Sequence, residues 1–329
     1  LNSFTPELIS NVSSLVCRVL DEEAYAPIVE AMREGCATGV FALQRHGLEH
    51  CWPASLLERA RDDVELRHWL ANPDARSESL PSALQSRWVD AAILPSVALP
   101  DTEIEAAVRE EGDVFQRLFG ARPTVAVPNT FVWSAAVERA WAADGVQCIV
   151  TCGRQYEGRA AEGGLMPPTR QVFNGEQGIG GIHYVVRDVY FEPIRGHRAE
   201  RVWQGVAERT ALGRPALIET HRESFIGPPE AAGQALAELV RALRGVVAHY
   251  PDVCFLTTAA VVDVFAASRS SPLIVRGLVF RAAVFLRRLL AVPALSRTLK
   301  LSGLSFMLPA LIGVLARVAP APCDGQAAC

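Results

Sequence analysis

The chain has 329 residues, of which half are hydrophobic and 21% are charged, and its formal net charge is -4. This length allows one large domain or two modest ones with a buried core, and the balance is that of a soluble globular protein. No excess of basic residues marks a nucleic-acid surface, so no nucleic-acid partner is expected.

The cysteines are scattered and form no C-x-x-C pair; they are Cys17, Cys36, Cys51, Cys148, Cys152, Cys254, Cys323 and Cys329. This pattern favours reduced, buried thiols over a disulfide framework. Cys51 follows His50 directly, and a structural role is expected for it rather than metal ligation. No secretory signal opens the printed sequence, which begins at leucine. The expected location is cytoplasmic, which includes a peripheral position on the inner face of the membrane.

Short apolar runs rich in β-branched residues alternate with helical patterns from residue 39 onward. The expected strands are 39–43, 124–127, 146–150, 182–191, 216–220 and 253–257. The expected helices include 21–34, 101–119, 134–144 and 230–249, with Ser134 as an N-cap and Gly145 closing its helix. This alternation predicts an α/β fold with a mostly parallel sheet, either open or closed into an irregular (β/α) barrel.

Two segments depart from that alternation. Residues 153–181 are rich in glycine and proline and predict a long loop over one face of the sheet. Residues 266–329 predict a separate helical tail after a domain formed by residues 1–265, with arginines among apolar residues and then an uncharged stretch, 301–316, interrupted by Pro309. We expect a basic amphipathic helix on an anionic membrane, with contact through residues 272–317, or else helices that pack on the domain or on a partner.

The stretch "HGLEH" at residues 46–50 follows an expected strand and holds two histidines four residues apart. Gly47 argues against the helix that carries the H-E-x-x-H metal motif. In a turn at this spacing the imidazoles lie ~5–6 Å apart, close enough to share one ion. Imidazoles suit zinc and similar divalent metals, so His46 and His50 are candidate ligands.

Two further strand ends carry polar residues. The run "ALIETHR" ends on His221, with Glu219 expected on the same face, and the two make a plausible proton-transfer pair. The run "TVAVPNTFVW" breaks at Pro128 and then presents Asn129, while Trp133 either offers a ring to a sugar or packs in the core.

Taken in order, "HGLEH", "VPNTFVW" and "THRESF" resemble a bacterial branch of the polysaccharide deacetylase superfamily whose motifs read roughly H-G-R-E-H, A-P-N-Y-V-W and S-H-R-V-N-F. The words "GRQ" (153–155) and "VRDVYFEP" (186–193) also match that branch. The resemblance covers about residues 25–265. It implies an irregular barrel of parallel strands that removes acetyl groups from glycans with a divalent metal, commonly zinc.

By this resemblance His46 and His50 are two of three protein ligands of the metal, and His221 is the general acid. Asn129 and Trp133 would line the substrate groove, with Arg154 and Arg222 as further substrate-binding residues. The superfamily's first motif, an Asp-Asp pair that provides the base and the third ligand, has no match between Leu1 and His46. Either the segment with that motif lies upstream of Leu1, or this protein has lost it. As a substitute within the chain, we hypothesise that Glu219 supplies the missing carboxylate, as ligand or as base, unless it only pairs with an arginine such as Arg154 or Arg222.

The expected substrate is an acetylated glycan or glycolipid. Two alternatives stay open. A non-catalytic glycan-binding or assembly protein would keep the barrel with a degenerate metal site. A glycoside hydrolase would need two carboxylates ~5–10 Å apart, for which Glu219 with Glu49 or Glu192 is nominally available.

Overall fold

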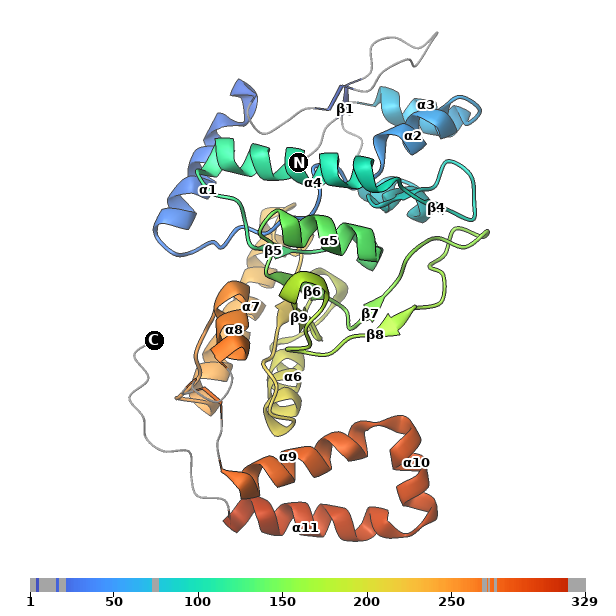
Figure 1. Cartoon of the computed structure of the whole chain (residues 1–329). Coiled ribbons are helices and arrows are strands. Elements are labelled where there is room, and N and C mark those ends of the chain that lie inside the picture. The colour runs from blue at the N-terminus through green and yellow to red at the C-terminus, as the bar shows by residue number, and fades with distance from the viewer. Residues whose placement is uncertain are drawn as a thin grey trace. The chain divides into compact units, whose positions relative to one another are not determined.

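The computed structural model describes residues 4–5, 16–17, 22–72, 77–267, 271, 273–274 and 277–318. They belong to two compact units, Leu1–Val186 with Thr257–Val262, and Arg187–Leu256 with Asp263–Cys329. Each unit buries hydrophobic clusters of its own (Figure 1). The boundary that the sequence predicts, at residue 265, stays a prediction. Arg276, Cys323 and Cys329 lie outside the described residues.

The first unit is organised by a parallel sheet of three strands in the order β5–β6–β9, formed by Val125–Ala126, Cys148–Thr151 and His183–Val186. Its register pairs Val125 with Cys148, and Cys148 with His183. The expected strand at 39–43 is not formed. Pairing begins two residues later, where Arg45 bridges Ala126 in parallel. This places His46 directly at the end of a sheet contact.

Shorter antiparallel pairs complete the strands of the first unit: β1 (Phe4–Thr5) with β2 (Val16–Cys17), β3 (Val89–Asp90) with β4 (Val97–Ala98), and β7 (Arg154–Gln155) with β8 (Arg170–Gln171). The expected long loop at 153–181 therefore contains the β7–β8 ribbon. The described strands form open sheets of two or three strands. The fold is mixed α/β with parallel strands, as predicted.

The helices of the first unit cover this sheet and its neighbours. They are η1 (Glu23–Tyr25), α1 (Ala26–Ala37), α2 (Pro53–Ala60), α3 (Val64–Ala71), η2 (Ser77–Ser79), η3 (Ser82–Gln85), α4 (Asp101–Phe119), η4 (Asn129–Phe131), α5 (Ala135–Ala143) and η5 (Ile179–Gly181). The predictions for α4 and α5 are confirmed. Ser134 caps α5 by accepting from the Val137 amide, and Gly145 follows its end with φ +88°.

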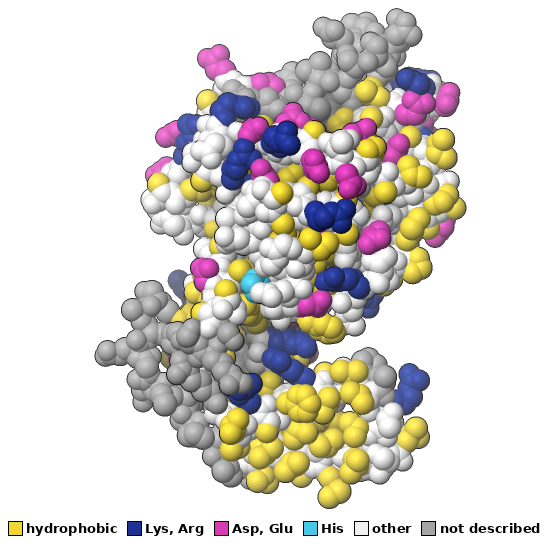
Figure 2. All heavy atoms as spheres, in the orientation of Figure 1, with side chains coloured by type: hydrophobic (Ala, Val, Ile, Leu, Met, Phe, Trp, Pro, Cys, Tyr) yellow, Lys and Arg dark blue, Asp and Glu magenta, His cyan; other side chains and the backbone are white. Residues whose placement is uncertain are grey.

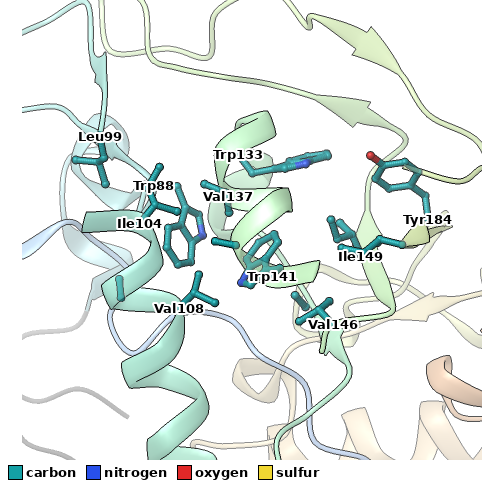
Figure 3. Packing of buried hydrophobic residues seen from close by; sticks show 14 of the residues in the cluster. Trp88, Leu99, Ile104, Val108, Trp133, Val137, Trp141, Val146, Ile149 and Tyr184 are labelled. Atoms are coloured by element: carbon teal, nitrogen blue, oxygen red, sulfur yellow. The ribbon is translucent and has the colours of Figure 1, made fainter. Parts of the chain in front are cut away.

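The core of the first unit lies where α4 and α5 pack against the sheet. Trp88, Trp133 and Trp141 are buried there with Ile104 and Ile149 (Figure 3). Edge-to-face packing of Trp88 on Trp141, with ring centroids 5.4 Å apart, joins the helix layer to the segment before β3. Each of the three indoles removes a large apolar area from water, so this cluster contributes strongly to the stability of the unit.

The second unit holds the remaining elements: β10 (Val189–Tyr190), η6 (Pro193–Arg195), α6 (Ala199–Ala211), β11 (Ile218–Glu219), η7 (Arg222–Ser224), α7 (Pro229–His249), α9 (Leu278–Ala291), α10 (Pro293–Leu301) and α11 (Leu304–Val318). Helix α8 (Thr258–Ala267) runs from one unit into the other. The expected strand 182–191 is divided into β9 and β10. The expected strand 253–257 is not formed, and its Phe255 and Leu256 are exposed.

Strands β10 and β11 pair in parallel, with Val189 opposite Ile218 and Tyr190 opposite Glu219. In the tail, no described helix taken singly has the length and apolarity needed to cross a bilayer. Leu295–Leu301 and Leu304–Leu315 meet that criterion only when joined, and a bend of 109° separates them.

Candidate functional site

The two histidines of "HGLEH" meet in a turn and not on a helix. Nε2 of His46 lies 2.8 Å from Nε2 of His50, and the ring centroids are 4.7 Å apart. Gly47 makes this turn possible, because its φ of +84° is in the left-handed region and a Cβ there would lie 2.9 Å from the Glu49 carbonyl oxygen. The expectation that both imidazoles lie on one side of a turn is confirmed.

The hydrogen bonds of His46 fix the position of its proton. Nδ1 lies 2.8 Å from the carbonyl oxygen of Val127 at the end of β5, and a carbonyl only accepts. Nδ1 of His46 therefore carries the hydrogen, and Nε2 presents a lone pair. When both rings are neutral, that lone pair accepts the hydrogen bond, and Nε2 of His50 is the donor. A backbone carbonyl on the far nitrogen is the arrangement that orients metal-ligating histidines.

This pair fits part of a divalent-metal site. Two nitrogens bound to one tetrahedral zinc lie roughly 3.3 Å apart, so the rings need to separate by roughly 0.5 Å and the His50 proton must move. Within the described ranges, however, no group of three His, Cys, Asp or Glu side chains is arranged to hold a metal. The pair thus provides two ligands, and the third ligand of the resemblance is not matched there.

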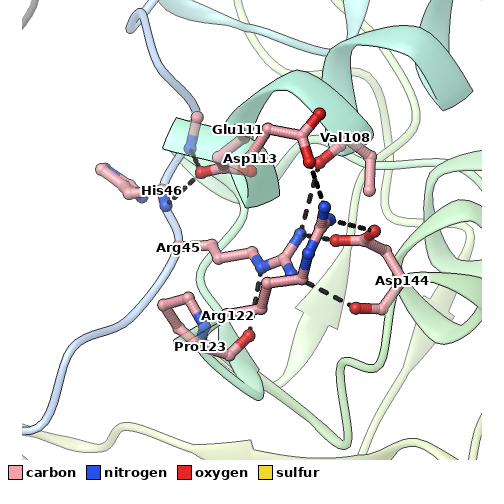
Figure 4. A network of polar contacts seen from close by, with 9 residues as sticks. Arg45, His46, Val108, Glu111, Asp113, Arg122, Pro123 and Asp144 are labelled. Atoms are coloured by element: carbon pink, nitrogen blue, oxygen red, sulfur yellow. Dashed lines mark hydrogen bonds and ion pairs between the residues drawn. The ribbon is translucent and has the colours of Figure 1, made fainter. Parts of the chain in front are cut away.

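Glu111 of α4 holds the turn through hydrogen bonds to its backbone. Its Oε1 accepts hydrogen bonds from the backbone amides of Gly47 at 2.7 Å and His46 at 3.1 Å (Figure 4). Burial raises the pKa of Glu111 to about 7, although the Gly47 amide, Arg45 and Arg87 act in the opposite direction. This carboxyl group holds the backbone that carries the first imidazole.

Arg45, the residue before His46, is fully buried. Its guanidinium donates to the carbonyl oxygens of Pro123 and Val108 and forms an ion pair of 2.6 Å with Asp144. Arg122 contacts the same carboxylate and also pairs with Asp113, so that two carboxylates balance the two guanidinium groups (Figure 4). The strand end that carries His46 is thereby tied to α4 and to the end of α5.

Glu49, between the histidines, pairs with Arg87 at 3.1 Å. The Arg87 guanidinium also lies over the Trp52 ring, 4.5 Å from its centroid. Both side chains of the ion pair are largely buried, so the carboxylate of Glu49 is committed to holding the turn against the segment before β3.

The backbone after β5 is strained where the second motif lies. Thr130 and Phe131 have φ of 52° and 61°, values that β-branched and bulky residues rarely adopt. Such outliers concentrate at functional sites. Asn129 is fully buried beside them, and a Cβ on Gly47 would lie 3.1 Å from its Oδ1. In the described part of the chain, neither polar atom of the Asn129 side chain has a hydrogen-bond partner.

Trp133 is fully buried in the core, with Nε1 3.4 Å from a carboxylate oxygen of Glu138. It presents no exposed ring face to a sugar, which agrees with the alternative expectation that it packs in the core. Arg154 is exposed on the β7–β8 ribbon, where its backbone pairs with Gln171.

In the second unit, His221 follows β11 and is held by a buried glutamate. Glu192 accepts from the His221 backbone amide at 2.8 Å and from Nδ1 at 2.5 Å. Nδ1 therefore carries a hydrogen, and the His221 side chain is half exposed. An imidazole oriented by a buried carboxylate is the arrangement of a general acid–base group.

Glu219 lies beside His221 as its strand alternation predicts, with Oε1 3.6 Å from Nε2. The arginine that pairs with Glu219 is Arg187, at 3.1 Å, in place of the expected Arg154 or Arg222. Arg222 itself is exposed and pairs with the neighbouring Glu223 at 3.4 Å.

Sequence reasoning missed Glu111 altogether, and it named Glu192 only as a nominal carboxylate of a glycoside hydrolase and not as the partner of His221. Glu192 lies inside the word "VRDVYFEP", so the motif contained the signal, although not the pairing with His221. Glu111 lies in the ordinary helical pattern of α4, and nothing in that pattern marks it. No protein-family model, no curated protein and no solved structure matches the chain.

Proposed function

We propose that the chain is a metal-dependent hydrolase that removes acetyl or similar acyl groups from a glycan or glycolipid. The proposed metal is a divalent ion, with zinc as the first candidate. The support comes from the motif resemblance to polysaccharide deacetylases and, above all, from one geometric observation. His46 is fixed in the tautomer whose Nε2 lone pair points at Nε2 of His50. The same resemblance proposes an irregular barrel of parallel strands, with which the β5–β6–β9 sheet is compatible.

The roles follow from the residues. His46 and His50 hold the metal, which when bound polarises the acyl carbonyl and supplies a hydroxide-like nucleophile near neutral pH. In the second unit, the resemblance supports His221, oriented by Glu192, as the general acid, with Glu219 as its neighbour. Arg154 and Arg222, which are both exposed, are proposed to contact the glycan, whereas Asn129 is fully buried like Trp133 and is not proposed as a contact.

The first test measures bound metal after purification and zinc loading. We expect bound zinc in the wild type and its loss in His46→Ala and His50→Ala. His68→Ala is a matched control, since His68 is an exposed histidine on α3. The loading is followed by elemental analysis and by the pH dependence of binding, because a metal ion binds only the neutral imidazoles and competes with protons for them.

The second test measures acetate release from N-acetylated and O-acetylated oligosaccharides. His221→Gln is expected to lose activity while it still binds zinc, because His221 acts on the proton and not as a ligand. A wild-type protein that binds no metal and releases no acetate, yet binds the glycans, would contradict the hydrolase and support the alternative, a glycan-binding protein.

A further inference from the structure

The tail of the second unit exposes an unusual apolar surface. Helices α9 and α11 pack on one another, and α10 connects them (Figure 1). Few of their side chains are buried, notably Ala283, Val284 and Ile312. The exposed large apolar residues of the three helices are Leu278, Phe285, Val292, Leu295, Leu301, Leu304, Phe306, Met307, Leu311 and Val314. Figure 2 shows hydrophobic side chains gathered over this hairpin. A patch of this extent marks an interaction surface.

The charge of the tail is of one sign. Between Asp263 and Asp324 the sequence has no Asp or Glu, whereas it has eight cations: Arg269, Arg276, Arg281, Arg287, Arg288, Arg297, Lys300 and Arg317. A surface that combines exposed apolar residues with cations alone is complementary to anionic lipid. A second copy of the chain would bring the same positive charge to the contact, and this disfavours self-association.

Two of the arginines fix the hairpin to its own unit. Arg288 donates to the carbonyl oxygens of Leu212 and Gly213 at 2.8 and 2.9 Å, and Arg287 donates to Ala211 at 3.2 Å. These carbonyls lie at the C-terminal end of α6, where cations are favourable. The hairpin is thus attached through α9, which leaves the corner between α10 and α11 available for contact.

That corner has the composition of a membrane-inserting tip. Leu301, Phe306 and Met307 are 85%, 84% and 69% exposed. Arg297 and Lys300 are exposed on the last turns of α10, directly before the corner. Long cationic side chains reach the lipid headgroups while neighbouring apolar side chains enter the acyl boundary.

We infer that the α10–α11 corner docks the protein on an anionic membrane surface, with Leu301, Phe306 and Met307 in the acyl boundary and Arg297 and Lys300 at the phosphate groups. This inference is independent of the proposed hydrolysis. Apolar insertion and charge attraction both contribute to membrane binding, and separate substitutions of the apolar and of the cationic side chains measure each contribution.

The experiment measures co-sedimentation of the full chain with phosphatidylcholine vesicles and with vesicles that also contain phosphatidylglycerol. We expect binding to the anionic vesicles, weakened by added salt. The double variant Phe306→Ser/Met307→Ser should lower the partition coefficient by about 100-fold. The matched control is Phe255→Ser/Leu256→Ser, an adjacent pair that is also exposed but lies outside the tail, and it should bind as the wild type does.

Charge is tested with Arg297→Gln/Lys300→Gln, for which we expect a loss on the order of 20-fold on anionic vesicles. The control Arg109→Gln/Arg244→Gln removes two exposed arginines of other helices. Equal binding to both vesicle types would overturn the anionic recognition. A dimer in sedimentation that Phe306→Ser/Met307→Ser abolishes, without vesicle binding by the wild type, would overturn the inference and assign the surface to a second copy.

Discussion

Nδ1 of His221 lies 2.5 Å from Oε1 of Glu192, and the same carboxylate accepts a hydrogen bond from the hydroxyl of Ser224 through its other oxygen. Glu192 also accepts from the His221 amide. One buried carboxylate therefore fixes the backbone, the ring and the tautomer of His221. Under the proposed hydrolysis, Glu192 is a positioning residue that acts through the histidine.

Replacement of Glu192 by glutamine keeps the shape of the side chain and removes the negative charge to which Nδ1 of His221 donates. We expect kcat to fall by about 10³-fold with a nearly unchanged KM, because the loss concerns proton transfer. The ¹⁵N shifts of the His221 ring should change from one tautomer to a mixture. Ser224→Ala, which leaves both contacts of Glu192 to His221, should retain most activity. An unchanged ring tautomer in Glu192→Gln would contradict the assignment.

Glu111 makes stability depend on pH. Burial raises the pKa of Glu111 to about 7 in the folded protein. At a pH between the pKa in the unfolded chain and this value, the folded state therefore keeps a proton that the unfolded state has released. The free energy of unfolding should therefore decline as the pH rises from about 4 to about 7, by on the order of 3 kcal/mol from this group.

The variant Glu111→Gln isolates this contribution. Its amide oxygen still accepts from the Gly47 and His46 amides, but it does not ionise. We expect chemical denaturation to give a higher stability than wild type at pH 8 and a smaller difference near pH 4.5. Parallel pH dependences in the two proteins would show that Glu111 does not carry the effect.

Several elements were predictable because local pattern and tertiary contact agree. The α4 segment has apolar residues at helical spacing, and α5 begins at a Ser cap and ends before Gly145. The turn at Gly47 followed from the glycine, and the nearness of Glu219 to His221 followed from strand alternation. Interactions between residues that are close in sequence determine these features, so the sequence alone was enough to predict them.

Other features depend on contacts between distant segments, and no local pattern reveals them. The apolar run 253–257 has the composition of a strand, yet no partner strand lies beside it among the described residues. Glu111 is 64 residues from Gly47 in sequence, and its buried contact with that turn appears only in the fold. The motif resemblance named the histidines because they are chemically distinctive, whereas Glu111 lies in an ordinary helical pattern and the pairing of Glu192 with His221 appears only in the fold.

The glycine-rich run before β9 is explained by close packing on a buried carboxylate. A Cβ on Gly178 would lie 2.0 Å from Oε1 of Glu138 and 2.4 Å from the Tyr184 hydroxyl. That Glu138 oxygen accepts from Tyr184 and from the Ile179 amide, each at 2.7 Å. We expect Gly178→Ala to lower the free energy of unfolding by about 2–4 kcal/mol, because it breaks a buried network.

Gly233→Ala is the matched control for Gly178→Ala. Gly233 lies within α7 with no atom within 4 Å of an added Cβ, and alanine there should stabilise by about 0.5–1 kcal/mol. Urea denaturation of both variants gives the comparison. Equal effects of the two substitutions would show that helix propensity, and not the Glu138 contact, determines the result.

The thiols of β6 and of the loop after it should differ sharply in reactivity. Burial raises the pKa of Cys148 to about 12, whereas Cys152, four residues later, is exposed. At pH 8 the thiolate fraction of Cys148 is on the order of 10⁻⁴, and the attacking reagent has no access to the side chain. We expect iodoacetamide to label Cys152 in the folded protein and to label Cys148 only after unfolding.

Peptide mass mapping over a time course measures both positions in one sample, with Cys152→Ser to confirm which peptide carries the fast label. Denaturant should make the two rates similar, because unfolding removes the burial that separates them. Rapid labelling of Cys148 in the native protein would mean that the sheet opens at β6. The centre of the β5–β6–β9 sheet would then be too mobile to hold the Val127 carbonyl against His46, and the fixed tautomer on which the metal proposal depends would be lost.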